Sequence, residues 1–171
     1  MNNDKKFTSL YCDLNHFKIF NDRYGFLKGD EVIKYTARLL LQVVHELGES
    51  DDLVGHVGGD DFIILTGTAA PSKLSHRIME RFDKEIRRFY SDKDLVREGI
   101  DIMDRHSQVV RYPILGIAIV GVNPKVRGLK NPEAISSVGM ELKKYVKQYR
   151  KSAYLEDRRK TTHPPHNPLN S

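Results

Sequence analysis

The chain has 171 residues, of which 39% are hydrophobic, so it can form one globular domain with a buried core. It contains no run near the ~20 apolar residues that a membrane span needs, no signal peptide at its start, and a single cysteine, Cys12, which agrees with a reducing, cytoplasmic location. These features exclude a membrane protein, a disulfide-rich secreted protein and a zinc finger. The net charge of +5 suits an anionic partner such as a nucleotide, a nucleic acid or a lipid headgroup.

Hydrophobic periodicity predicts strands and helices that alternate along the chain. The first helix is expected to be capped by Asn15, and the second to begin at Asp30 and end at Gly48. The expected elements are, in chain order, a strand over 8–12, helices over 16–23 and 30–47, a hairpin of strands over 53–57 and 62–65, a helix over 72–90, strands over 99–103 and 109–122, a helix over 132–149 and a strand over 152–155.

This order predicts an α/β (α+β) domain with a mixed central sheet flanked by helices. We expect the globular domain to occupy residues 1–160. Residues 161–171 are rich in proline and have almost nothing to bury, so they are expected to form a disordered tail.

Three carboxylates are expected at one rim of the sheet. Asp13 follows the first strand, while Asp60 and Asp61 follow Gly58 and Gly59 at the tip of the predicted hairpin. If the hairpin pairs beside the first strand, these like charges lie close together, which is costly unless a cation such as Mg²⁺ lies among them. The glycines would let a phosphate approach the backbone. The alternative is a Gly-Gly turn followed by solvated aspartates.

Asn21 and Asp30 are candidates for recognising a guanine base. Asn21 carries both a donor and an acceptor, and an ionised Asp30 accepts from the N1–H and amino groups of the guanine edge. The alternative for Asp30 is a helix N-cap, a role that its short side chain fills well.

The last predicted helix carries a run of basic residues. Lys147 and Lys151 are spaced i, i+4 and could reach the same anion, although a run of this kind is also typical of a solvated face. The run comprises Lys143, Lys144, Lys147, Arg150 and Lys151. The seven histidines have no zinc-ligand spacing, and Cys12 lies inside an apolar strand, so neither a zinc site nor a cysteine nucleophile is predicted.

Taken in order, these segments resemble the GGDEF domain of the diguanylate cyclase family. Residues 13–22 with Tyr24-Gly25 and Gly29-Asp30 are similar to the opening of that domain, and Gly-Gly-Asp-Asp-Phe at 58–62 resembles its signature hairpin. The resemblance covers about residues 7 to 156. It implies a fold like that of the nucleotidyl cyclases, with ferredoxin-like topology, and the condensation of two GTP into cyclic di-GMP with release of two pyrophosphates.

The resemblance also implies a metal site and a catalytic set. Asp13, Asp60 and the Leu14 carbonyl would hold Mg²⁺ (or Mn²⁺). Asp60, Asp61 and Lys18 would be the catalytic residues, Lys18 by stabilising charge on the phosphoryl group.

The implied substrate is GTP, bound once in each domain of a homodimer. Asn21 and Asp30 would read guanine. Gly58 and Gly59 would pass close to the phosphates, and Lys147 and Lys151 would neutralise the β- and γ-phosphates.

Two departures from the family pattern, at Asp61 and Glu49, carry consequences. Asp61 stands where the family has Glu, and a carboxylate withdrawn by one methylene can cost ~10²-fold in rate. Glu49 replaces the arginine of the product-inhibition motif, so no feedback site of that kind is expected. The Gly-Gly-Asp-Asp-Phe form resembles the variant in proteins that also carry EAL and CBS domains, which implies such partners in a longer protein.

Two functional hypotheses are compatible with this set of site residues. The first is an active diguanylate cyclase, and the second is a degenerate domain that binds GTP and regulates an attached EAL phosphodiesterase without catalysis. A third, an RNA-binding module, would need exposed aromatic residues on the central strands, whereas residues 62–65 form an apolar run. We therefore expect neither nucleic-acid binding nor membrane contact by this domain.

Overall fold

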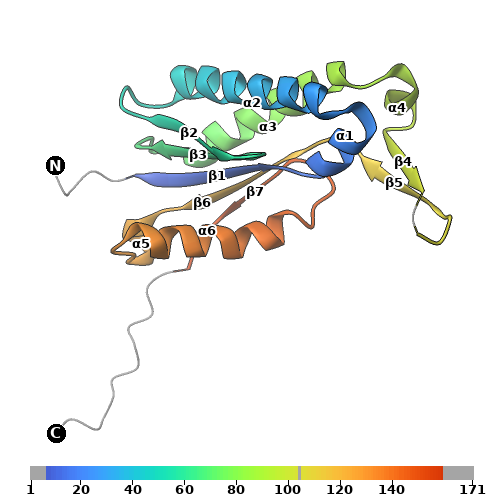
Figure 1. The fold of residues 1–171 in the computed structure, drawn as a ribbon. Coiled ribbons are helices and arrows are strands. Elements are labelled where there is room, and N and C mark those ends of the chain that lie inside the picture. Colours follow the sequence, from blue (N-terminus) through green and yellow to red (C-terminus); the bar gives the residue numbers. More distant parts are fainter. Residues whose placement is uncertain (1–6, 104, 160–171) are drawn as a thin grey trace, which may run out of the picture.

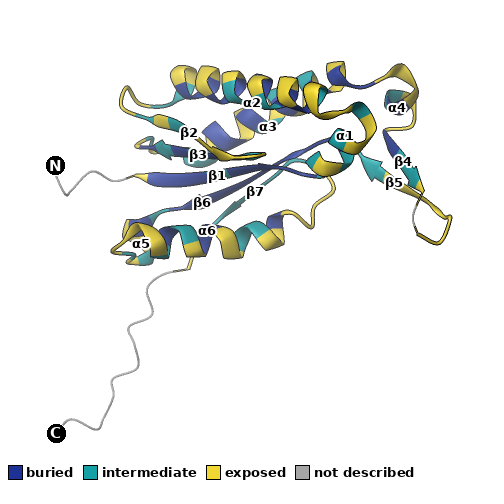
Figure 2. Ribbon diagram, viewed as in Figure 1, coloured by how far each residue is buried: buried dark blue, intermediate teal, exposed yellow. Residues whose placement is uncertain are grey.

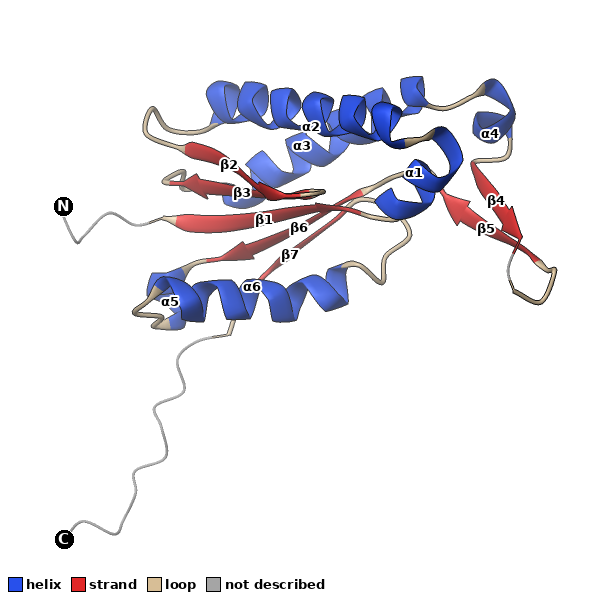
Figure 3. Ribbon diagram, viewed as in Figure 1, coloured by secondary structure: helices blue, strands red, loops and turns tan. Residues whose placement is uncertain are grey.

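The computed structural model describes residues 7–103 and 105–159. They form a five-stranded sheet between two layers of helices, with a separate two-stranded hairpin at one side (Figure 1; Figure 3). The strands are β1 (Thr8–Leu14), β2 (Leu53–Gly58), β3 (Asp61–Thr66), β4 (Gly99–Met103), β5 (Val109–Pro113), β6 (Ile117–Val122) and β7 (Ala153–Glu156). The helices are α1 (Phe17–Tyr24), α2 (Phe26–Leu47), α3 (Pro71–Glu85), the 3₁₀ turn η1 (Ile86–Phe89), α4 (Asp92–Val96), α5 (Pro124–Arg127) and α6 (Pro132–Val146).

The sheet has the order β2-β3-β1-β6-β7. The β2–β3, β3–β1 and β1–β6 pairs are antiparallel, whereas β7 runs parallel to β6. The predicted mixed sheet flanked by helices is therefore confirmed. The expected tail, 161–171, lies outside the described residues.

Helices cover both faces of the sheet, and each layer encloses its own core (Figure 2). α2 and α3 pack on one face with fully buried side chains such as Leu40 and Phe82. On the other face α6 places Ile135 and Val138 against Val120 of β6. All six residues of β6 are buried, as expected for a strand covered on both sides. Of the helices described, none is both long and apolar enough to cross a membrane.

The start of α2 differs from the prediction. The helix begins at Phe26, because Gly25 with φ 86° turns the chain directly from α1 into α2. Asp30 therefore lies inside the second turn, and the N-cap interpretation of Asp30 is wrong. The cap expected from Asn15 is also wrong: His16 is the capping residue, and the buried Asn15 donates from Nδ2 to the carbonyl of Lys151 over 3.4 Å.

The second half of the chain also departs from the expected boundaries. The single strand expected over 109–122 is divided into β5 and β6, with Gly116 between them. A Cβ on Gly116 would lie 2.6 Å from the Ser152 nitrogen, so this backbone approach requires glycine. The sequence analysis missed α4 and α5, whose N-caps are Ser91 and Asn123.

Candidate functional site

Two of the predicted carboxylates face each other at one end of the sheet. Asp13 on β1 is the cross-strand partner of Asp61 on β3, so the hairpin does pair beside the first strand. The Asp13 side chain is 2% exposed, and the Asp61 side chain is 41% exposed. A buried carboxylate beside a second carboxylate requires positive charge nearby.

That positive charge comes from the end of α6. The ammonium of Lys143 lies 2.6 Å from Oδ2 of Asp13 and also donates to Oδ1 of Asp61. The ammonium of Lys147 lies 2.6 Å from Oδ1 of Asp13. Both oxygens of Asp13 therefore face a lysine, and the two carboxylates and two ammonium groups balance in charge.

The same contacts separate the pKa values of the two acids. Burial raises the pKa of Asp13 to about 6, against the opposing effect of the two lysines. Partial burial acts to raise the pKa of Asp61, but the hydrogen bonds with Lys143 and Asp13 and the charges of Lys143 and Lys147 together outweigh it, so that pKa is lowered. At neutral pH both groups are thus held as carboxylates.

The tip of the β2–β3 hairpin presents an open backbone. Gly58 and Gly59 have φ values of 150° and 57°, which other residues rarely adopt. A Cβ at either position would meet nothing within 4 Å, so the space beside this turn is free. The tip is fastened by His56, whose Nε2 lies 2.9 Å from the carbonyl of Gly59.

A cavity of about 470 Å³ lies between this tip, α1 and the residue after α6. Six residues of the predicted site line it, and they come from separate segments of the chain. They are Leu14, Lys18, Asn21, Gly59, Asp60 and Lys147. The sequence analysis did not assign four other lining residues to the site, and no signal in their spacing distinguishes them: His16, Phe17, Asp22 and Phe26.

Asn21 reaches the cavity from α1 and packs against α2. Its Oδ1 lies 1.9 Å from the position that a Cβ on Gly29 would occupy, so the glycine makes room for the amide. Within the described residues this buried Oδ1 has no hydrogen-bond partner. Asp30 follows Gly29 and is exposed, and its side chain does not line the cavity.

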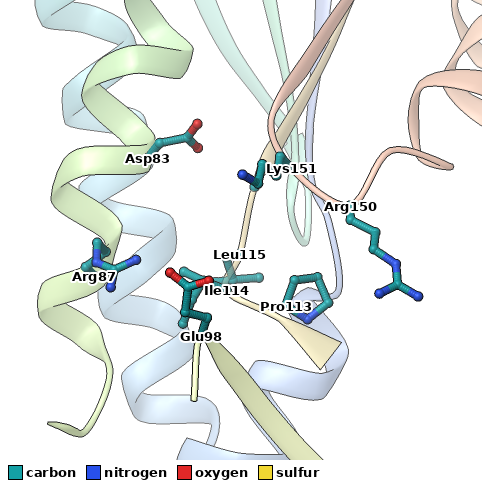
Figure 4. A pocket seen from close by; sticks show the side chains of 9 residues that line it. Asp83, Arg87, Glu98, Pro113, Ile114, Leu115, Arg150 and Lys151 are labelled. Atoms are coloured by element: carbon teal, nitrogen blue, oxygen red, sulfur yellow. The ribbon is translucent and has the colours of Figure 1, made fainter. Parts of the chain in front are cut away.

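Lys151 lies elsewhere. Because α6 ends at Val146, Lys147 and Lys151 do not share a helical face, and the predicted i, i+4 approach to one anion is wrong. Lys151 lines a second cavity, of about 220 Å³, where it faces Asp83 of α3 (Figure 4).

Lys143 is a further site residue that was not predicted from the sequence. It appeared only as a member of the basic run on the last helix. The sequence did contain one signal for this role: Lys143 precedes Lys147 by four residues, so α6 places the two lysines one turn apart.

The donor set of the site is chemically suited to a hard divalent cation. Asp13, Asp60 and the Leu14 carbonyl offer oxygen ligands, which Mg²⁺ prefers. In the described arrangement, however, Asp13 is committed to two lysines. Nowhere in 7–103 and 105–159 do three His, Cys, Asp or Glu side chains gather in a way that could hold a metal ion. A metal would thus share Asp13 with an ammonium group or displace it.

A known protein family and several known proteins resemble this chain. The family model described as "Diguanylate cyclase, GGDEF domain" matches residues 1–103. The chain is 35% identical over 80 residues to the signaling protein YkoW of Bacillus subtilis and 36% identical over 76 residues to a diguanylate cyclase of Vibrio cholerae. These alignments cover 44% and 43% of this chain but only 10% and 22% of the two relatives, so the chain spans less than a quarter of either protein's length.

Similarity to solved structures extends over most of the chain. The active GGEEF domain of a diguanylate cyclase from Vibrio cholerae matches with a TM-score of 0.59 at 20% identity, over 88% of this chain and 83% of that one. The family model, which covers more than half of the sequence, identifies this chain as a member of the GGDEF domain family of diguanylate cyclases.

Proposed function

We propose that this domain binds GTP in the cavity beside Asn21 and condenses two GTP molecules into cyclic di-GMP. The observation that carries the proposal is the lining of that cavity, where β1, α1, the hairpin tip and the end of α6 meet. Asn21, with Asp30 nearby on α2, would read the guanine edge. Gly58 and Gly59 would leave room for the phosphates, and Lys18 and Lys147 would neutralise them.

The chemistry is phosphoryl transfer by positioning and charge neutralisation. The 3′-hydroxyl of each GTP gives its proton to the solvent, and its oxygen forms a bond to the α-phosphorus of the other GTP. The bond from that phosphorus to the oxygen bridging to the β-phosphate breaks, so the two steps release two pyrophosphates. Mg²⁺ or Mn²⁺, held by Asp13, Asp60 and the Leu14 carbonyl, would supply charge neutralisation when bound. Asp61 lies beside Asp13, where its carboxylate can orient the reacting hydroxyl.

The reaction needs two domains, since each cavity takes one nucleotide. We therefore propose a homodimer with the two sites face to face. The curated relatives are much longer than this chain, and we propose that attached EAL and CBS domains surround it in a longer protein.

A second function is favoured by one observation. Lys143 occupies the space between Asp13 and Asp61, and Asp61 is one methylene shorter than the glutamate of the family. If Lys143 and the shorter Asp61 side chain prevent catalysis, the domain would bind GTP and regulate an attached phosphodiesterase without making product.

Two measurements on the same preparation separate these functions. Binding is followed with a fluorescent GTP analogue, and turnover by chromatographic detection of cyclic di-GMP after incubation with GTP and Mg²⁺ at high protein concentration. Binding with product supports the cyclase, binding without product supports the regulatory domain, and absence of binding overturns both. Asp13→Asn should abolish turnover, whereas Asp92→Asn, an exposed carboxylate on α4, is the charge-matched control.

A further inference from the structure

Lys143 bridges two carboxylates from neighbouring strands. Its ammonium contacts Oδ2 of Asp13 at 2.6 Å and Oδ1 of Asp61. The Lys143 side chain is only 20% exposed. A bridge of this kind, between a buried carboxylate and a second carboxylate beside it, is the position that a divalent cation takes in a carboxylate site.

We propose that Lys143 is a resident cation that takes the place of a divalent ion between Asp13 and Asp61 and lowers the affinity of this pair for Mg²⁺ and Mn²⁺. The inference shares Asp13 with the metal site of the proposed function, but it concerns the Asp13–Asp61 pair and requires neither GTP binding nor turnover. An ammonium group supplies one compact charge and three donors, and two of those donors have carboxylate acceptors here.

Asp13, Asp61, Lys143 and Lys147 form one charged cluster, in which Lys147 has a different role from Lys143. Among the carboxylates of the described residues it pairs with Asp13 alone, its side chain is 42% exposed, and it lines the nucleotide cavity. The ammonium of Lys147 can therefore leave Asp13 and bind a phosphate instead, while its side chain stays at the surface. Lys143 does not line that cavity and is fixed by two acids, so it is the lysine that an incoming ion must displace.

The arrangement sets an order of events. Because Asp13 and Asp61 are already neutralised, a free divalent ion gains little from entering alone. A nucleotide whose phosphates attract Lys147 frees one oxygen of Asp13 from its ion pair. The divalent ion therefore enters together with the triphosphate.

The test measures Mn²⁺ binding without nucleotide, by the electron paramagnetic resonance signal of free Mn²⁺. The variant is Lys143→Met, which keeps an unbranched side chain one atom shorter and removes its charge. Lys144→Met is the matched control, since it removes the same charge from the adjacent position, outside the cluster. We expect Lys143→Met to bind Mn²⁺ about tenfold more tightly than the unmodified chain and Lys144→Met to be unchanged. Equal affinity in all three proteins, or an equal gain in both variants, overturns the proposal.

A second readout separates this role from a structural one. Lys143→Met leaves two carboxylates with less positive charge beside them, so its melting temperature should fall and should be restored by Mn²⁺ but not by an equal ionic strength of Na⁺. A fall that Mn²⁺ does not reverse contradicts the proposal. Lys143→Gln keeps a hydrogen-bond donor at this position and gives the same test if the methionine variant does not fold. Loss of GTP binding with tight Mn²⁺ binding would overturn the proposed function and leave this inference standing.

Discussion

Oδ1 of Asn21 occupies the space that a side chain on Gly29 would take, with only 1.9 Å between that oxygen and the place of an added Cβ. Gly29→Ala must therefore displace the amide of Asn21 from the cavity wall. We expect the affinity for a fluorescent GTP analogue to fall about tenfold, which corresponds to the loss of about one hydrogen bond. The helix itself gains propensity from alanine, so the free energy of unfolding should change little.

A double-mutant cycle checks this coupling. Asn21→Ala alone should weaken binding as much as Gly29→Ala, and the two together should cost no more than either one. Additive losses would show that Gly29 acts on binding independently of Asn21.

Asp61→Glu is expected to increase cyclic di-GMP formation, because it returns the missing methylene to the signature. The gain should be larger in a Lys143→Met background, since Lys143 contacts both Asp61 and Asp13. Product formed per minute at saturating GTP and Mn²⁺ is the measurement, and about a tenfold difference between the two backgrounds is expected. An equal gain in both backgrounds would mean that Lys143 does not limit turnover.

Asp94 ties α4 to α1 through Arg23 and Tyr24. Burial acts to raise the pKa of Asp94, but hydrogen bonds from Tyr24, Arg23 and Ser91 outweigh it and lower that pKa. A carboxyl with a lowered folded-state pKa stabilises the protein above its unfolded pKa, and this stabilisation is lost as the pH falls through the folded value. We expect Asp94→Asn to reduce the free energy of unfolding in urea by about 2 kcal/mol at about pH 7 and by much less at about pH 3. A loss of unfolding free energy that is the same at both pH values would contradict this link between the pKa of Asp94 and stability.

Cys12 should be chemically inert in the folded protein. Its side chain is 1% exposed, and burial, assisted by the charge of Asp13, raises the pKa of the thiol to about 12. At about pH 8 the thiolate population is then ~10³ lower than that of an ordinary cysteine. A colorimetric thiol reagent should react at least ~10²-fold more slowly with the native chain than with the chain in concentrated urea. Comparable rates would indicate that β1 opens readily.

The sequence predicted the features that depend on local rules. Alternation and the Gly58-Gly59 turn located the hairpin, and the strand ending near Asp13 placed the first acid correctly. The helix start was wrong because Gly25, rather than the better capping residue Asp30, forms the corner between α1 and α2. The pairing of Lys143 with Asp13 joins residues far apart in the sequence and depends on how α6 crosses the sheet, which no local pattern contains.

The position of β1 in the middle of the sheet has a consequence for biosynthesis. Within this domain β1 (8–14) is synthesised before both of its neighbours in the sheet: β3 spans 61–66 and β6 spans 117–122, and the edge strand β7 follows at 153–156. A nascent chain that ends before β6 can pair β1 with β3 only, and one side of the strand stays open until β6 emerges. Such long-range pairing slows folding and exposes an apolar edge meanwhile. Truncation before β6 should therefore yield aggregates rather than a smaller folded unit.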